Sequence, residues 1–272
     1  MRAIVSIDKF VLEYMDVPLS EFFRFYLNAL SKCKVKIVYG KLYCYQLHIR
    51  LEKGVYLHLF YRNFRETGAL STLRLETRPE NYNQFREMLN RIRNVASRIE
   101  FVSCDVAYDV PSSVSNVFVM SKDMRRKIRG KFETTRYFGK PEQRKQDGYC
   151  RVYDKKQELW DRHGKDIDGE LTRIEIVYKP AEKIALADLR RHPPEQNRQY
   201  FATVIIDWSN IKPKKVEQIR NLQEGTNIYS RYIREGVKET LANQYVLDFN
   251  WLAREQWRKL IEKPCAAVLG IA

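Results

Sequence analysis

Four acidic residues lie inside segments that otherwise have the composition of β-strands. They are Glu76, Asp105, Asp109 and Glu175. Strands disfavour Asp and Glu, and carboxylates that lie close together repel one another unless a cation or an arginine neutralises them. Carboxylate oxygens suit Mg²⁺ or Mn²⁺ better than zinc. The pattern therefore predicts either a divalent-cation site or a set of cross-strand ion pairs, with Arg74 and Arg173 as the partners.

A cation site would be formed by Glu76, Asp105 and Glu175, if the three strands that carry them are neighbours. Asp109 is four residues beyond Asp105, which is ~13 Å along an extended strand. We therefore expect Asp109 to lie outside a site that includes Asp105.

A second group with chemical potential is the segment CRVYDKKQE at 150–158. Arg151, Tyr153 and Lys155 are two residues apart, so on a strand they share one face. Cations beside a phenol lower its pKa from about 10 and screen the charge of a phosphodiester, which favours attack by the tyrosine. The alternative is that Tyr153 is one of the many tyrosines that pack at strand ends.

Several classes of enzyme lack their motifs in this chain. The sequence contains no phosphate-binding loop of the Walker type and no pair of histidines separated by one apolar residue. Its five cysteines are odd in number and form no C-x-x-C pair, which argues against a zinc site or a disulfide framework and favours a reducing cytoplasm.

The charge of the chain indicates its partner. Lys and Arg exceed Asp and Glu by 49 − 34 = +15, and such a basic chain usually binds a polyanion. No run of apolar residues approaches the ~18 that a membrane span needs. Nucleic acid is therefore the expected partner.

The polar residues described above must be positioned by strands and helices. Alternation of apolar and polar residues predicts strands at 35–49, 55–61, 71–79, 99–110, 131–139, 149–156 and 171–179. Apolar residues that recur every three or four positions predict helices within 81–99, at 113–128, twice within 214–240, and at 247–262 with Asp248 as N-cap.

These elements predict an α+β fold with a curved, mostly antiparallel sheet, flanking helices and a helical C-terminal region. The triplets Arg74-Leu-Glu76 and Arg173-Ile-Glu175 both lie in mid-strand, end near a proline and precede a helix. This short internal repeat suggests that the sheet is built from two related β-rich halves. We place the α+β body at 1–190 and the mainly helical region at 191–272.

The order of the motifs resembles that of the Rep_trans family, the initiators of rolling-circle plasmid replication. Its T-x-Y-F/I-G strand is matched by residues 135–139, and its R-I/V-Y-x-K-K strand by 151–156. Its R-x-E-I strand is matched by residues 173–176. Upstream, its strand with two acids four residues apart is matched by Asp105 and Asp109, and its earlier R-x-E strand by Arg74 and Glu76. The resemblance covers about 70–180.

The resemblance implies that Tyr153 is the nucleophile, with Arg151 and Lys155 beside it, and that the strand carboxylates hold Mg²⁺ or Mn²⁺. Attack on origin DNA would leave a 5′-phosphotyrosine and a free 3′-OH. The family further implies a homodimer, an inverted-repeat origin, a host helicase as partner and DNA recognition toward the C-terminus. There the cations Arg254, Arg258 and Lys259 recur at helical spacing.

Two other functions are compatible with the composition. A non-catalytic DNA-binding regulator of a phage or mobile element could have the same fold, but it would have no need of Tyr153 and the acids. An RNA-binding module would display aromatic pairs on an open sheet, and Tyr43, Tyr45 and Tyr56 could supply them, although no RNP-like motif is present.

Overall fold

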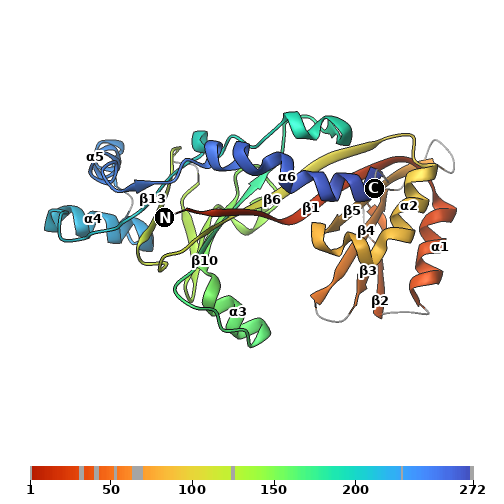
Figure 1. Ribbon diagram of the computed structural model, residues 1–272, viewed down its shortest axis with the longest axis horizontal. Helices are drawn as coiled ribbons and strands as arrows, with labels where there is room; N and C mark the ends of the chain where they lie inside the picture. The colour runs from red at the N-terminus through yellow and green to blue at the C-terminus, as the bar shows by residue number, and fades with distance from the viewer. Residues whose placement is uncertain are drawn as a thin grey trace. The chain divides into compact units, whose positions relative to one another are not determined.

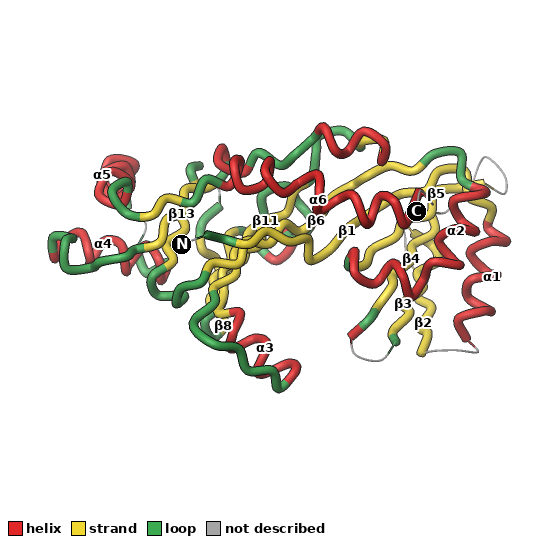
Figure 2. The backbone as a smooth tube through the Cα atoms, in the orientation of Figure 1, coloured by secondary structure: helices red, strands yellow, loops and turns green. Residues whose placement is uncertain are grey.

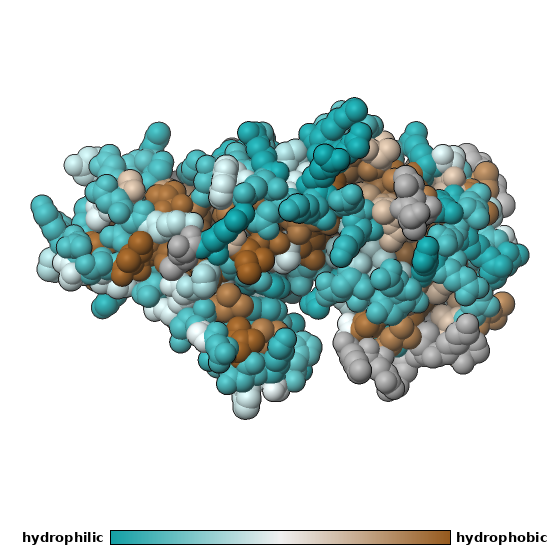
Figure 3. Space-filling model, viewed as in Figure 1, coloured by the Kyte–Doolittle hydropathy of each residue, from teal (hydrophilic) through white to brown (hydrophobic). Residues whose placement is uncertain are grey.

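The computed structural model describes residues 2–30, 34–39, 43–51, 54–62, 70–123, 126–227 and 229–269. It has the predicted α+β architecture, in which a large antiparallel sheet, a second small sheet and several helices are combined (Figure 1). The face of the molecule in Figure 3 is mostly hydrophilic, with small apolar patches.

The chain forms two compact units, each assembled from three segments. We call them the Tyr153 unit (Met1–Ser6, Val106–Tyr178 and Pro194–Gln256) and the Glu76 unit (Ile7–Asp105, Lys179–Pro193 and Trp257–Ala272). Strand β6 (Ile99–Val110) and helix α6 (Phe249–Leu269) each have residues in both units. The functional boundary that we predict at residue 190 stays a prediction.

The Glu76 unit contains an antiparallel sheet in the order β2-β3-β4-β5-β1-β6. Its strands are β1 (Ile4–Pro18), β2 (Lys34–Tyr39), β3 (Tyr43–Arg50), β4 (Tyr56–Arg62) and β5 (Leu70–Thr77), and β12 (Ile184–Ala185) pairs with β6. Helices α1 (Leu19–Leu30) and α2 (Arg86–Val95) lie beside this sheet (Figure 1), with 3-10 turns η2 (Pro79–Phe85) and η4 (Leu186–Arg191). Aromatic rings fill the core: Phe10 contacts Phe101 and Tyr82, and Phe22 contacts Tyr45 and Tyr61.

The Tyr153 unit contains the strand order β6-β11-β10-β9-β8 and the small sheet β14-β13-β7. The first set comprises β8 (Ile128–Phe132), β9 (Thr135–Phe138), β10 (Cys150–Asp154) and β11 (Thr172–Tyr178); the second comprises β7 (Val117–Ser121), β13 (Tyr200–Val204) and β14 (Tyr245–Val246). Its helices are α3 (Lys155–His163), α4 (Pro213–Glu224), α5 (Arg231–Leu241) and part of α6, with 3-10 turns η3 (Pro141–Gln143) and η5 (Gln196–Arg198).

The predicted strands at 71–79, 99–110 and 171–179 are confirmed, as are two helices within 214–240 and the C-terminal helix. Asp248 caps that last helix, because its Oδ1 accepts a hydrogen bond of 2.9 Å from the amide of Trp251. The C-terminal region also contains β13 and β14, which the sequence did not predict.

Four element predictions are wrong. Residues 113–128 contain strand β7 instead of a helix, because the apolar run at 117–120 is buried and pairs with β13. The segments at 35–49 and 131–139 each form two paired strands instead of one. Finally, Lys155 does not continue the strand of Tyr153, because helix α3 begins there (Figure 2). Asp154 caps this helix by accepting a hydrogen bond of 2.9 Å from the amide of Gln157.

Candidate active site

Strands β10 and β11 bring the candidate nucleophile against an acid. In their antiparallel register, Tyr153 lies opposite Arg173 and Arg151 lies opposite Glu175. The hydroxyl of Tyr153 donates a hydrogen bond of 2.5 Å to Oε1 of Glu175, and Nη2 of Arg151 donates to Oε2 of the same carboxylate. Glu175 is therefore shared between a phenol and a guanidinium, and its side chain is only 3% exposed.

Arg173 connects this carboxylate to a second acid. Its Nε and Nη2 donate to the two carboxylate oxygens of Asp109 at 2.6 and 2.7 Å, and its Nη1 lies 3.9 Å from Oε1 of Glu175. Such a two-point pair fixes the plane of the guanidinium as well as its position. Asp109 therefore orients Arg173, which lies between Asp109 and the Tyr153–Glu175 pair.

The environment of Tyr153 raises the pKa of its phenol well above the ordinary value. Burial has the largest effect, followed by the negative charge of Glu175 and its hydrogen bond, while Arg173 acts in the opposite direction. The expectation that neighbouring cations lower this pKa is therefore wrong for this arrangement. The phenol is neutral near pH 7 and points its proton at a carboxylate that can accept it.

Lys155 lies beside the phenol ring, although the helix and not the strand positions it. Its ammonium is 6.0 Å from the centroid of the Tyr153 ring and 2.5 Å from Oε2 of Glu158. The side chain is mostly buried, so it contributes a fixed positive charge near the tyrosine.

The other two acids predicted for a cation site belong to the Glu76 unit. Oε1 of Glu76 accepts a hydrogen bond of 3.0 Å from Nε of Arg74, and Oδ2 of Asp105 lies 3.3 Å from Nζ of Lys9. Both carboxylates are buried. A single site with Glu175 would combine residues of both units, and it stays a prediction.

The three predicted carboxylates have the oxygen ligands that Mg²⁺ or Mn²⁺ prefers, but neighbouring arginine and lysine side chains already neutralise their charge. Glu76, Asp105 and Glu175 each pair with an arginine or a lysine. In the described ranges of the chain, no three His, Cys, Asp or Glu side chains converge in the way a metal ion requires. A bound ion would therefore have to compete with these side chains.

A second polar cluster surrounds the first R-x-E triplet. The hydroxyl of Tyr43 donates to Oε1 of Glu13 at 3.1 Å, Nη1 of Arg74 lies 3.9 Å from the same oxygen, and Nζ of Lys183 lies 2.5 Å from Oε2. The triplet has a paired strand on each side. On β4, Phe60 lies opposite Arg74 and His58 lies opposite Glu76, and on β1, Glu13 lies opposite Arg74.

The three cations predicted to bind DNA lie on α6. Arg254, Arg258 and Lys259 are exposed, and Nη2 of Arg254 lies 3.1 Å from Oε1 of Glu195. Trp257 and Ile261 of the same helix are buried in the core. This helix is therefore anchored by apolar residues and presents its cations outward.

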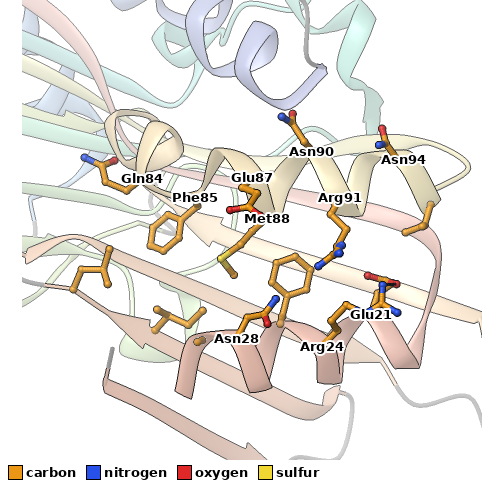
Figure 4. A pocket seen from close by; sticks show the side chains of 15 residues that line it. Glu21, Arg24, Asn28, Gln84, Phe85, Glu87, Met88, Asn90, Arg91 and Asn94 are labelled. Atoms are coloured by element: carbon orange, nitrogen blue, oxygen red, sulfur yellow. Dashed lines mark ion pairs between the residues drawn. The ribbon is translucent and has the colours of Figure 1, made fainter. Parts of the chain in front are cut away.

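The contacts of Asp109 and Arg173 were not predicted individually. The signal for them was present, because both are charged residues inside strands, but the sequence alone does not give the register that joins them. A cavity of about 740 Å³ between α1 and α2 was also not predicted (Figure 4). It contains none of the predicted site residues; Phe25, Phe85 and Met88 line it together with polar residues such as Glu21 and Arg91.

A scan against protein-family models finds no match to this chain, and a search of curated proteins finds no relative. Across the part of the chain that the structure describes, no helix is both long enough and apolar enough to span a membrane.

Proposed function

We propose that this chain is a DNA-nicking and DNA-closing enzyme that initiates rolling-circle replication of a plasmid, with Tyr153 as the nucleophile. The observation that carries the proposal is the hydrogen bond from the Tyr153 hydroxyl to Glu175, with Arg151 and Arg173 on either side. A tyrosine, a proton acceptor and two guanidinium groups are the parts that attack on a phosphodiester requires.

In the nicking step, Oη of Tyr153 forms a bond to the scissile phosphorus and the bond from phosphorus to the 3′-oxygen breaks. The phenol proton passes to the carboxylate of Glu175, and the leaving 3′-oxygen takes up a proton from water to become a free hydroxyl. The products are a 5′-phosphotyrosine and a 3′-OH that can prime a polymerase. The reverse reaction rejoins the strand.

The cations around the tyrosine have separate roles in this proposal. Arg151 is the most exposed of them, with 36% of its side chain accessible, so it can reach the phosphate oxygens. Arg173 is held by Asp109 and stabilises the phenolate as the proton leaves. Lys155 adds positive charge beside the ring. Preorganised charges of this kind commonly provide the largest part of catalysis.

The proposal includes a divalent cation, Mg²⁺ or Mn²⁺, which Glu76, Asp105 and Glu175 would hold. When bound, such an ion would polarise the phosphate and neutralise its charge. The ion pairs of these carboxylates with arginine and lysine mean that binding should require displacement of those cations.

The remaining parts of the proposal concern partners and architecture. We place the protein in the cytoplasm as a homodimer on an inverted-repeat origin, where it recruits a host helicase, and Arg254, Arg258 and Lys259 contact DNA phosphates. We also propose that the sheet consists of two related halves. The match of the R-x-E triplets in β5 and β11, each with a polar cluster around it, supports that relationship.

The decisive experiment is covalent trapping. The protein is incubated with Mg²⁺ or Mn²⁺ and 5′-end and 3′-end labelled pools of a randomised single-stranded oligonucleotide. We expect an adduct that survives denaturation and retains the 3′-end label only, and peptide mapping should place it on Tyr153. Tyr153→Phe is the control. An adduct on another residue, or no adduct with any substrate that the protein binds, would overturn the proposal.

The second candidate is a DNA-binding regulator without catalysis. The pairing of the polar groups around Tyr153 with one another favours it, because such a network also stabilises a fold. Tight and specific DNA binding without an adduct would support this function.

A further inference from the structure

The order of elements β13-α4-α5-β14 places two helices between strands that pair with each other. Val204 lies opposite Tyr245, and Thr203 lies opposite Val246. Both ends of the helix pair are therefore tied to one small sheet. Two consecutive helices on such a support are the arrangement in which many proteins present the second helix to the major groove of DNA.

The helix pair has its own core. Buried side chains from β7, β13 and both helices pack together; they are Phe118, Met120, Phe201, Ile205, Ile211, Ile219, Val237 and Leu241. Gly236 of α5 has no side chain at the point where Nζ of Lys215 from α4 approaches, since an added Cβ would lie 2.8 Å from it. The shared core thus packs α4 and α5 against the small sheet.

The turn between the helices is anchored to the hairpin that begins with β8. Gly225 ends α4 with a positive φ of 69°, and a Cβ there would lie 3.1 Å from the side chain of Ile128. Arg234 of α5 donates a hydrogen bond to the carbonyl of Ser121, which fixes the helix to the end of β7. The start of α5 is therefore set by two separate contacts.

The outer side of α5 carries two large, exposed side chains in its first turn. Tyr232 is 88% exposed, and Arg231 beside it is exposed as well. No hydrogen bond or ion pair holds either side chain within the part of the chain that the structure describes. These two residues belong to the first turn, which is the part of a recognition helix that contacts base edges.

The surroundings of this turn are basic. Arg126, Lys127 and Arg129 line a small cavity together with Tyr229 and Arg234, so the cations of the hairpin gather at the start of α5. Residues 212–241 contain seven Lys and Arg against four Asp and Glu. Two of the four acids lie further along α5, where Glu235 is 3.7 Å from Lys238 and Glu239 is in the last turn. The other two, Glu217 and Glu224, lie in α4, and Asp123 lines the cavity beside the cations. Positive charge around a protruding helix complements a phosphate backbone.

We propose that α5 reads the sequence of duplex DNA in the major groove, with Arg231 and Tyr232 at the base edges and Lys127 and Arg129 on the flanking phosphates. This inference rests on the proposed function and gives it a recognition element. It also separates two roles, because phosphate contacts position a protein whereas base contacts specify a site. Helix α6, with Arg254, Arg258 and Lys259, supplies contacts of the first kind.

The test uses selection from a duplex library with a randomised central segment, followed by sequencing of the bound fraction. We expect the wild-type protein to enrich a motif. Arg231→Ala with Tyr232→Ala should lose that motif and bind the selected duplex about 10- to 100-fold more weakly. The control Arg198→Ala removes an exposed cation of the same unit and should retain both motif and affinity. Thermal unfolding confirms that each variant is folded, and the two single variants replace the double variant if it is not.

An unchanged motif in the double variant would overturn the proposal, as would the absence of any motif in the wild type. Covalent trapping on single-stranded oligonucleotides is measured in parallel. If the double variant still forms the adduct while the motif is lost, recognition by α5 and catalysis by Tyr153 are separate functions. If the substitutions in α5 leave the enriched motif unchanged but the adduct forms, only the inference about α5 fails.

Discussion

The R-x-E triplets of β5 and β11 are alike in sequence, but the strand paired with each one differs. Opposite Arg173 and Glu175 of β11 lie Tyr153 and Arg151, whereas opposite Arg74 and Glu76 of β5 lie Phe60 and His58. The first pairing supplies a hydroxyl and a guanidinium, and the second supplies neither. The neighbouring strand therefore decides which triplet has a nucleophile, because cross-strand pairs are the closest side chains on one face of a sheet.

The cluster of the Glu76 unit does contain a tyrosine, but it is connected differently. Tyr43 comes from β3 and donates to Glu13 of β1, so its partner is not the acid of the triplet. Glu13 also has Lys183 within 2.5 Å. We interpret this cluster as a stabilising network and the cluster at Tyr153 as the reactive one. The following experiments are designed to separate the two.

The largest difference between the two clusters should come from removing the tyrosine hydroxyl of each one in turn. Tyr153→Phe should abolish the covalent adduct and DNA nicking while DNA binding is unchanged, because only the hydroxyl is lost. The Tyr43→Phe variant should nick DNA at the wild-type rate. Denaturing gels with labelled oligonucleotide measure both. An adduct that persists in Tyr153→Phe would transfer the role of nucleophile, with Tyr137 and Tyr149 as the next candidates.

The next effect concerns the acids that accept the two phenol hydrogen bonds. Glu175→Gln should reduce the nicking rate by about 10²- to 10⁴-fold, the usual contribution of a general base, whereas Glu13→Gln should leave the rate within a few fold. Single-turnover kinetics at several Mn²⁺ concentrations measure this. A defect in Glu175→Gln that high Mn²⁺ repairs would assign the residue to ion binding and not to proton transfer.

The pH dependence of Tyr153 follows from its environment. Burial and Glu175 favour the neutral phenol and raise its pKa, so the folded state binds the proton more tightly than the unfolded state. The resulting stability is complete below about pH 10, the ordinary pKa of a tyrosine, and decreases as the pH rises above it. At pH 10, the wild type and Tyr153→Phe should therefore show the same phenolate absorbance. A signal of one half-ionised tyrosine at that pH would refute the assigned environment.

A smaller effect is expected from the ion pairs that hold each cluster. Asp109→Asn breaks the two-point pair with Arg173, whose side chain is 12% exposed, and should lower the free energy of unfolding by about 1–3 kcal/mol. Lys183→Ala removes a partner of Glu13 that is 43% exposed, and should cost about 0–1 kcal/mol. Urea denaturation compares them, and equal losses would show that the two networks are equivalent in stability.

The smallest expected effect comes from adding a hydroxyl. Phe60→Tyr places a phenol opposite Arg74 at a partly buried position, and should change the free energy of unfolding by less than about 1 kcal/mol. In the Tyr153→Phe background it should not restore the adduct, since the position opposite Glu76 is His58 and not an arginine. Restored activity would show that the hydroxyl alone distinguishes the two strand pairs.

The sequence predicted the strands of the site better than their contacts. Alternation of apolar and polar residues located the strands that carry Glu76, Asp105 and Glu175, although both faces of these strands are largely buried. It could not show that Asp109 pairs with Arg173, since that contact depends on which strands are neighbours. The sequence did contain the evidence that Tyr153 and Glu175 lie in strands, but not the register that joins them.

The errors have local physical causes. The run at 117–120 is apolar on both sides, so neither helical nor strand periodicity distinguishes it, and its pairing with β13 decides the outcome. Lys155 was assigned to the strand of Tyr153 because the alternation continues through it. The N-cap hydrogen bond of Asp154 starts a helix at that point, and it overrides the alternation.

The division of each unit into three segments has a consequence for how the protein is made. The Glu76 unit includes residues from Trp257 onward, and the Tyr153 unit includes residues up to Gln256. During synthesis, therefore, neither unit can be completed before its last segment, which follows residue 193 in the Tyr153 unit and residue 256 in the Glu76 unit, has left the ribosome. Contacts between residues so distant in sequence also make folding slow. We expect nascent chains to depend on chaperones, and no contiguous fragment should reproduce either unit alone.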